Sequence, residues 1–181
     1  MNWDEQLFFF INGLVGRHPW LDLLMVELGR PSNLRIPAAV GLVFWVWRKR
    51  REAVIAAVVV GLVVVLGDAL GAQLKYLVGR ARPCQILTGI HELVGCGKTL
   101  SFPSNHVLNM AAVVGFLGVL YPKTGWVGWP FVMLLAISRV FVGAHYLTDG
   151  LGGAAIGGLL GAGVAVLLLR APWFRRLSTL T

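Results

Sequence analysis

Charged residues are scarce in this sequence. Asp, Glu, Lys and Arg together make up 13% of its 181 residues, about half of the roughly 25% that soluble domains carry. Apolar residues make up 57% of the chain and gather in long uninterrupted runs. A soluble globular domain and a disordered chain are both excluded, and lipid is the solvent that this composition fits.

Cysteine and acidic residues are also few. Two cysteines exclude a disulfide-dense secreted scaffold. Eight acidic residues stand against sixteen basic ones, but no basic stripe is interleaved with aromatic residues, so we expect no nucleic-acid partner. The excess of Lys and Arg is instead typical of the cytoplasmic ends of membrane helices. Because Asp4 and Glu5 open the chain where a signal peptide would be basic, we expect no cleaved signal.

Long charge-poor runs predict membrane helices. A helix needs roughly 20 residues to cross the hydrocarbon. Four runs are clear and a fifth includes Arg35; they are residues 53–74, 104–121, 126–146 and 150–169, and then 31–47. We therefore predict an all-α, polytopic integral membrane helical bundle of about five to six transmembrane helices.

The chain is predicted to form one membrane domain, residues 1–181. Residues 1–30 form an amphipathic N-terminal segment, 31–169 the transmembrane bundle that carries the catalytic groups, and 170–181 a basic cytoplasmic tail. Glycine and proline break the N-terminal segment into two short pieces. These pieces either lie in the membrane interface or cross it once as a bent helix.

Lys and Arg in the short loops predict the orientation. Alternating the five spans collects eight basic residues on one face: Arg48, Lys49, Arg50, Arg51, Lys123, Arg170, Arg175 and Arg176. The other face has four: Lys75, Arg80, Arg82 and Lys98. The richer face is predicted to be cytoplasmic. Cys84 and Cys96 then fall in an outer loop, where an oxidising compartment permits a disulfide; two free buried thiols are the alternative.

Ionisable residues gather at the outer ends of the predicted spans. Three separate segments contribute to this cluster: Lys75 and Arg82, then Ser104 and His106, then Arg139, His145 and Asp149. Cations that converge at membrane depth repel one another unless an anion lies between them. A phosphate group carries the matching charge, and arginine binds its oxygens bidentately. Backbone N–H groups at the helix start near Ser104 are expected to face the same anion.

The two histidines in this cluster indicate a reaction as well as binding. In a helical segment the spacing of His145 and Asp149 places them on one face, so that the carboxylate accepts the Nδ1 proton and Nε2 is the nucleophile. His106, from another helix, can protonate the leaving oxygen. Too few carboxylates are present to hold a divalent metal, so we expect metal-free phosphoryl transfer.

The remaining polar residues receive simpler interpretations. Arg80 and Lys98 are interpreted as helix-end anchors, and His18 and His91 as structural residues. Asp68 lies seven residues before Lys75 and is either its counter-ion or a neutral acid hydrogen-bonded within the bundle. The glycines spaced by four in the last span are expected to serve helix packing.

These residues resemble the signatures of the type-2 phosphatidic acid phosphatase superfamily of membrane lipid phosphatases. The first signature is a Lys and, after six residues, Arg-Pro, as in Lys75 and Arg82-Pro83. The second is Pro-Ser-Gly-His, similar to Pro103-Ser104-Asn105-His106. The third is Ser-Arg, five residues, His, three residues and Asp, which matches Ser138-Arg139, His145 and Asp149. The resemblance covers residues 75–149, and Asn105 in place of Gly departs from it.

The resemblance implies a role for each matched residue. Phosphate binding falls to Lys75, Arg82 and Arg139, with Ser104 assisting. His145 is implied as the nucleophile, Asp149 as its orienting acid and His106 as the general acid. Asn105 and Asp68 are expected to contact these residues without binding the phosphate themselves.

The implied enzyme is a metal-independent lipid phosphatase or diphosphatase that uses no cofactor and forms a phosphohistidine. Expected substrates are undecaprenyl pyrophosphate, phosphatidylglycerol phosphate, phosphatidic acid or a lipid A phosphate, and its other partners are membrane lipids. The expected location is a bacterial-type inner membrane, with the active site facing the periplasm or the exterior. A non-catalytic lipid-phosphate carrier with the same cationic pocket is the main alternative, and a haloperoxidase-like vanadate site is a third interpretation.

Overall fold

The computed structural model describes the backbone of residues 1–174, and it describes side chains there except at 31–40, 42, 46, 49 and 50. Arg175, Arg176 and the side chain of Arg35, all used in the sequence analysis, lie outside the described parts. Every regular element in residues 1–174 is a helix. Their bounds are α1 Trp3–Asn12, α2 Pro19–Leu28, α3 Pro31–Val78, α4 Pro83–Ile86, α5 Asn105–Leu120, α6 Pro122–Phe141 and α7 Leu147–Arg170.

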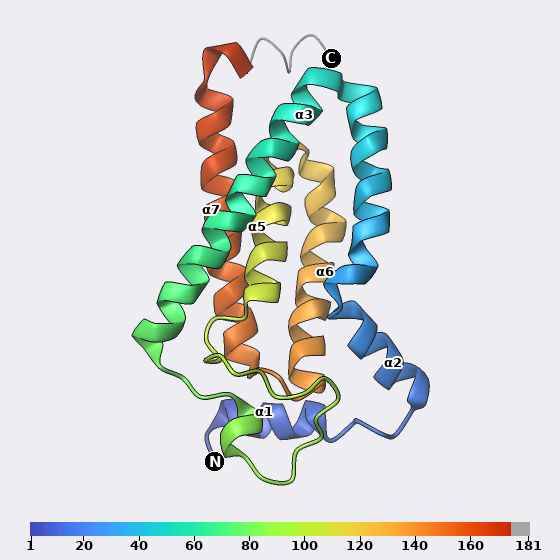
Figure 1. Ribbon diagram of the computed structural model, residues 1–181, viewed down its shortest axis with the longest axis vertical. Helices are drawn as coiled ribbons and strands as arrows, with labels where there is room; N and C mark the ends of the chain where they lie inside the picture. The colour runs from blue at the N-terminus through green and yellow to red at the C-terminus, as the bar shows by residue number, and fades with distance from the viewer. Residues whose placement is uncertain (175–181) are drawn as a thin grey trace.

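The long helix α3 supplies two arms of the bundle. Figure 1 shows it bent near its middle, one arm rising from Pro31 and the other descending to Val78. The predicted spans 31–47 and 53–74 therefore lie in one bent helix instead of two separate ones. The basic residues Arg48 to Arg51 fall near the bend, at the end of the molecule opposite the N-terminus.

Helix α5 is the centre of the bundle and contacts α3, α6 and α7. One apolar cluster packs Val107 and Ala111 of α5 against Val132 of α6 and Ala154 of α7. The glycines of α7 allow the closest approach to α5. A Cβ added at Gly157 would lie 2.0 Å from Leu108 O, so the packing role predicted for these glycines is confirmed.

Three helices in the described residues are long and apolar enough to cross a membrane: Arg51–Ile86, which takes in the descending arm of α3 and α4, and then α6 and α7. Helix α5 is apolar but has 16 residues, and the exact number of crossings stays a prediction.

Helix α6 ends before the end of the predicted 126–146 span. It ends at Phe141, and Gly143 then turns the chain with a positive φ of 83°, which L side chains rarely adopt.

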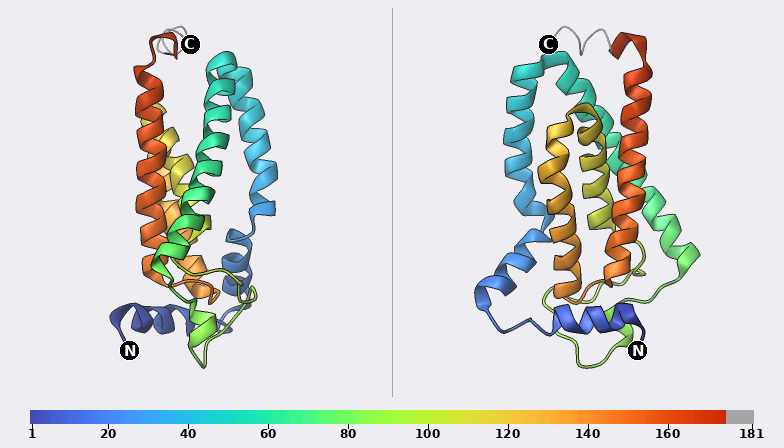
Figure 2. Two further views of the ribbon diagram at one scale, coloured as in Figure 1. Left: turned by 60° about the vertical axis from the view of Figure 1, so that its left-hand side comes forward. Right: turned by 180° about the vertical axis from the view of Figure 1, so that it is seen from behind.

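The N-terminal segment forms α1 and α2 instead of one bent crossing. In both views of Figure 2, α1 lies across the end of the bundle, at a steep angle to the long helices. Trp3 and Phe10 of α1 are largely exposed, as expected at a membrane interface. Asn12 ties α1 to the bundle because its Nδ2 donates to Phe141 O and to His91 O, each at 2.8 Å.

The two ends of the bundle differ in content. The end next to α1 holds the loop after α3 and the α6–α7 connection, while the opposite end holds the α3 bend, the α5–α6 connection and the end of α7 (Figure 1). Each connection thus lies at the end where alternating the five predicted spans placed it. Which end faces the cytoplasm stays a prediction.

Candidate active site

A cavity of about 620 Å³ opens at the α1 end of the bundle. Four of the residues singled out in the sequence line it together: Arg82, His106, Arg139 and His145. They come from the loop after α3, from α5, from α6 and from the connection between α6 and α7. Two histidines and two arginines thus share a space large enough for a phosphate and part of its organic group.

His145 lies in the α6–α7 connection and not in a helix. The prediction that helical stacking joins His145 to Asp149 is therefore wrong, because the helix stops at Phe141. The two side chains still meet. Asp149 in the first turn of α7 folds back to accept the backbone N–H of Tyr146 at 2.9 Å, which brings its Oδ2 to 3.5 Å from His145 Nδ1.

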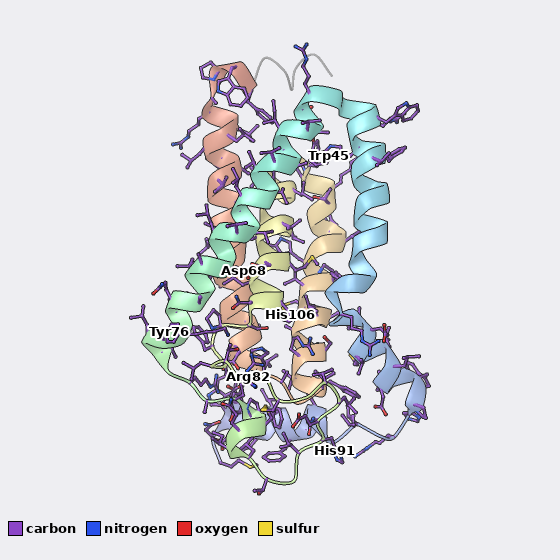
Figure 3. The ribbon with its side chains drawn as sticks, in the orientation of Figure 1. Trp45, Asp68, Tyr76, Arg82, His91 and His106 are labelled. Atoms are coloured by element: carbon purple, nitrogen blue, oxygen red, sulfur yellow. A yellow bond between two sulfur atoms is a disulfide. The ribbon has the colours of Figure 1, made fainter. Side chains whose placement is uncertain are left out.

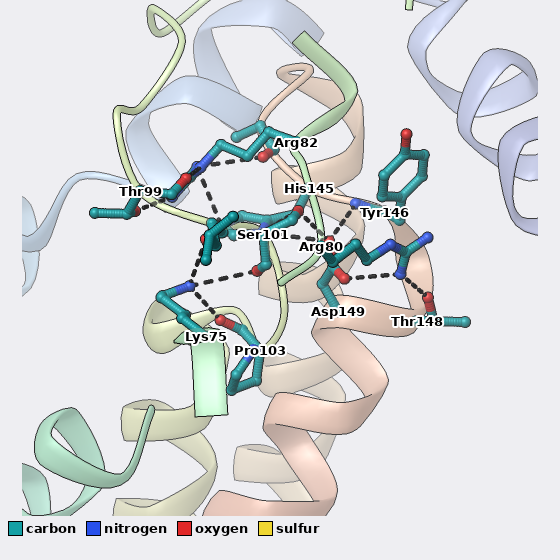
Figure 4. Close-up of polar contacts among 12 residues, drawn as sticks. Lys75, Arg80, Arg82, Thr99, Ser101, Pro103, His145, Tyr146, Thr148 and Asp149 are labelled. Carbon is teal, nitrogen blue, oxygen red and sulfur yellow. Dashed lines mark hydrogen bonds and ion pairs between the residues drawn. The ribbon is translucent and has the colours of Figure 1, made fainter. Parts of the chain in front are cut away.

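The hydroxyl of Ser101 lies between this histidine and the carboxylate. Its Oγ donates to Asp149 Oδ2 and is 3.3 Å from His145 Nδ1 (Figure 4). Because the Ser101 proton goes to Asp149, the hydroxyl accepts from Nδ1–H, and we assign that tautomer to His145. The lone pair of His145 is then on Nε2, the atom next to Arg82.

Burial keeps the His145 imidazole neutral. Removal from water lowers the pKa of His145 from 6.5 to about 4; the hydrogen bond with Asp149 opposes this shift, and the positive charge of Arg82 adds to it. The side chain is therefore uncharged near pH 7. A neutral imidazole is the form that can attack phosphorus.

Arg82 is fixed beside His145 by the loop in front of it. Its Nε donates to Thr99 O at 2.7 Å and its Nη2 to Thr99 Oγ1 at 2.9 Å. Its Nη1 lies 3.4 Å from His145 Nε2. The guanidinium thus stands where a phosphate attached to Nε2 would place its oxygens.

A disulfide holds the same loop. Cys84 of α4 is bonded to Cys96, and Gln85 Nε2 donates to Gly97 O at 3.1 Å. Gly97 packs against the Arg82 side chain, since a Cβ there would lie 2.9 Å from Cζ. The disulfide therefore lies in the cavity wall that carries Arg82.

Arg139 and Ser104 each keep a polar atom without a partner in the described part of the chain. Arg139 Nε and Ser104 Oγ are buried and make no hydrogen bond, although Arg139 Nη1 donates to Gly29 O at 3.3 Å. Such atoms are costly to bury alone. A phosphate oxygen would satisfy Arg139 Nε, which belongs to a residue that lines the cavity.

Lys75 does not line the cavity. Its ammonium donates to three backbone carbonyls of the loop that precedes α5, those of Leu100, Ser101 and Pro103 at 2.9, 3.4 and 2.7 Å (Figure 4). These bonds use its three protons. In this arrangement Lys75 holds the segment that carries Ser101, and its direct contact with phosphate stays a prediction.

His106 is the second residue of α5 and lines the cavity. Its imidazole makes no hydrogen bond with the described residues, so both ring nitrogens are available to a ligand. Its neighbour Asn105 is the first residue of α5 and takes no left-handed conformation, so the Gly of the family signature is not needed here. Asn105 and Asn109 both donate to Asp68 Oδ1, at 3.1 and 2.8 Å. Asp68 lies farther from the α1 end than His106 (Figure 3), and its carboxylate accepts from these amides instead of pairing with Lys75.

Arg80 and Ser101 were not recognised from the sequence. The interpretation of Arg80 as a membrane anchor is wrong, because its guanidinium turns inward and its Nη1 donates to Asp149 Oδ1 at 2.8 Å. Its position, within the first signature and two residues before Arg82, was the available signal. Ser101 gave no signal, since a small hydroxyl residue in a loop is unremarkable in sequence.

The described residues contain no group of three or more His, Cys, Asp or Glu side chains that could hold a metal ion. The donors at the cavity are guanidinium and imidazole groups. Such a set attracts an anion and repels a free cation.

The chain is similar to several known proteins. Residues 52–173 match the family model described as the PAP2 superfamily. The chain is 30% identical to the bacitracin transport permease protein BcrC of Bacillus licheniformis over 153 residues, which are 83% of this chain and 73% of that protein. It is 28% identical to the undecaprenyl-diphosphatase BcrC of Bacillus subtilis over 87% of this chain and 80% of that one.

A solved structure is similar over nearly the whole chain. It is described as the first transmembrane PAP2 type phosphatidylglycerolphosphate phosphatase from Bacillus subtilis, and its TM-score is 0.67 at 28% identity. The likeness covers 92% of this chain and 87% of that one. The helix arrangement therefore has a precedent in a known transmembrane protein.

Proposed function

The chain belongs to the PAP2 superfamily of membrane phosphatases, and we propose that it removes the terminal phosphate from a lipid phosphate through a phosphohistidine, without a metal. It is a helical integral membrane protein and a hydrolase of phosphoric esters. The observation that carries the proposal is the shared cavity of His106, His145, Arg82 and Arg139. These residues are the catalytic and phosphate-binding groups of the proposed reaction, with Asp149 and Ser104 supporting them.

In the first step His145 Nε2 attacks phosphorus and the bond from phosphorus to the lipid oxygen breaks. The electron pair of that bond goes to the leaving oxygen, which takes a proton from His106. The Nδ1 proton of His145 is held by Ser101 and Asp149, which stabilise the charge that develops on the ring. Arg82 and Arg139 hold the equatorial oxygens as charge spreads over them.

In the second step water attacks the phosphohistidine. His106, now neutral, accepts a proton from the water, and the bond between phosphorus and Nε2 breaks with its electrons returning to the imidazole. Phosphate leaves and the enzyme is restored. His106 thus acts first as acid and then as base, which requires it to face the phosphorus across from His145.

The proposed substrate class is a lipid whose phosphate or diphosphate lies at the surface of the outer leaflet of the membrane that holds the protein. A polyprenyl diphosphate such as undecaprenyl pyrophosphate is our first choice, in line with the name of the Bacillus subtilis relative. Phosphatidylglycerol phosphate, phosphatidic acid and lipid A phosphate complete the panel. Phosphate release by the detergent-solubilised protein from these four lipids tests the function, and binding without release from any of them would favour the carrier.

The proposed site faces the periplasm or the exterior of a bacterial-type inner membrane. Support comes from the basic residues at the opposite end: Arg48 near the bend of α3, Lys123 in the first turn of α6 and Arg170 at the end of α7. We further propose a single domain over residues 1–181, with the bundle of residues 31–169 as its catalytic part.

Chelation is expected to leave the activity unchanged. Because the cavity offers cations in place of metal ligands, phosphate release in excess EDTA should stay within about twofold of the rate in untreated buffer. The measurement is a steady-state assay with each substrate before and after dialysis against EDTA. A rate that falls away and returns on adding a divalent cation would contradict metal-free catalysis.

The pH profile is expected to report the lowered pKa of His145. Its pKa is about 4 instead of 6.5, so the reactive neutral form persists down to about pH 5 and is lost as the pH falls through 4. On the acid side, kcat/KM should therefore decline near pH 4, once corrected for the ionisation of the substrate phosphate measured by ³¹P NMR. An enzyme group that titrates near 6.5 on the acid side would contradict this assignment.

A further inference from the structure

Asp4 is a buried acid for which the mechanism so far has no use. It lies in the first turn of α1 with 4% of its surface exposed, although its neighbours in this helix face outward. Burying a carboxylate is costly unless strong partners surround it. The family match begins only at residue 52, so neither Asp4 nor α1 belongs to the matched part of the chain.

The partners of Asp4 lead directly to the catalytic carboxylate. Asp4 Oδ2 accepts from Arg80 Nη2 at 2.7 Å, and the other terminal nitrogen of the same guanidinium donates to Asp149 Oδ1 at 2.8 Å. Thr148, next to Asp149, donates to Asp4 from both its backbone N–H and its hydroxyl. One arginine fork therefore joins the N-terminal helix to the first turn of α7. Figure 4 shows the contacts of Arg80 with Asp149 and Thr148.

The guanidinium is held on its face as well as at its edge. Its Cζ lies 3.9 Å from the centre of the Tyr146 ring, an attractive arrangement for a cation. Tyr146 is the residue between His145 and α7, and Phe8 of α1 packs against its ring with centroids 5.8 Å apart. Helix α1 thus fixes both the arginine and the residue that follows the nucleophile.

This contact sets the direction of the Asp149 carboxylate. Its Oδ1 is bound by Arg80, so its Oδ2 must point to Ser101, Tyr146 N–H and His145 Nδ1. Without Asp4, Nη2 of Arg80 would lose its anion, and Arg80, 27% of whose side chain is exposed, could turn toward water. The carboxylate would then lose the contact that keeps it aimed at the histidine.

We propose that Asp4 is a positioning residue for the nucleophile, acting through Arg80 on Asp149, so that the N-terminal helix is a working part of the active site. The proposal rests on the proposed phosphohistidine mechanism. Asp4 touches no substrate and does not line the cavity. Its loss should therefore slow the chemical step and leave the affinity for the lipid phosphate unchanged.

Asp4→Asn is the direct test. We expect kcat to fall about 10- to 100-fold, the size typical of small misplacements of catalytic groups, while KM stays within about twofold. Glu5→Gln is the matched control, because it removes the same charge from the next position of α1, where Glu5 binds only the backbone N–H of Asn2. Its kcat should equal that of the wild type. Melting temperatures in detergent identify the folded fraction of each variant.

A double-mutant cycle with Arg80→Lys separates positioning from simple packing. Lysine cannot bridge two carboxylates as a fork does, so Arg80→Lys alone should lower kcat, and adding Asp4→Asn should lower it no further. The proposal would be overturned if the reductions of kcat caused by the two substitutions multiply in the double variant. It would also be overturned if Asp4→Asn keeps the wild-type kcat. If Asp4→Asn does not fold, Asp4→Glu replaces it, with kcat expected to be at least threefold below wild type and an unchanged value overturning the proposal.

The same assays distinguish the two levels of the argument. A wild-type protein that releases no phosphate from any lipid in the panel would defeat the proposed function. An active wild-type protein whose Asp4→Asn variant is equally active would defeat only the role of Asp4.

Discussion

His145→Ala is expected to lower kcat by on the order of 10⁴-fold or more. The variant removes the atom that we propose bonds phosphorus, the Nε2 that lies 3.4 Å from Arg82 Nη1. The arginines and His106 stay in place, so lipid phosphate should still bind. KM, or the dissociation constant of a non-hydrolysed phosphonate analogue, should therefore change far less than kcat.

Phosphate release and analogue binding by the same purified protein check this expectation. The matched control is His91→Ala, because His91 is an exposed histidine in the loop between α4 and α5 and does not line the cavity. That variant should keep wild-type kcat. Residual turnover by His145→Ala within tenfold of the wild type would mean that another group, or water itself, attacks phosphorus.

His106→Ala is expected to lower kcat by about 10²- to 10⁴-fold on a natural lipid phosphate. The reason is that an alcohol oxygen leaves poorly without a proton, and His106 is the residue on the cavity wall that can supply it. With a nitrophenyl phosphate the leaving group needs no proton. The first step should then survive the substitution, while the second step, which needs His106 as base, stays slow.

The variant should therefore release nitrophenol in a burst and then turn over slowly. Rapid-mixing absorbance measures the burst, whose size should approach one nitrophenol per enzyme. Lys98→Ala, which removes an exposed cation from the loop between α4 and α5, should show wild-type turnover of both substrates. Equal losses on the lipid and on the nitrophenyl ester, with no burst, would contradict the role of His106 as acid.

The sequence predicted the components of the cavity well, because their chemistry is local and distinctive. Charge-poor runs predicted helices, and a few ionisable groups at their outer ends stood out against an apolar background. Alternation of the helices then required those groups to meet at one end. Arg82, His106, Arg139 and His145 do line one cavity.

The sequence could not predict how the side chains divide their hydrogen bonds. Lys75 was expected to meet phosphate, yet the backbone carbonyls of the loop before α5 use all its protons, and their direction depends on the fold of that irregular loop. Asp68 had two candidate partners in sequence. In the structure Asp68 accepts hydrogen bonds from Asn105 and Asn109 of α5. These side chains fit against α3 because Gly67 and Gly71 leave room for them.

Long-range contacts with the N-terminal helix were equally invisible. Nothing in the local pattern around Asp4 indicates an ion pair with Arg80, 76 positions away. The spacing of His145 and Asp149 predicted their contact for the wrong reason. It assumed a continuous helix, but Gly143 turns the chain and α7 begins only at Leu147. Tertiary structure brought the pair together by another route, through the first turn of α7.

Trapping the phosphoenzyme tests the central claim most directly. The enzyme is mixed with lipid substrate carrying ³²P in its terminal phosphate, quenched in alkali within milliseconds and digested for mass spectrometry. The account predicts an acid-labile, alkali-stable label on the peptide that contains His145, absent from His145→Ala. Turnover with no label on that histidine, or a label on another residue, would contradict it.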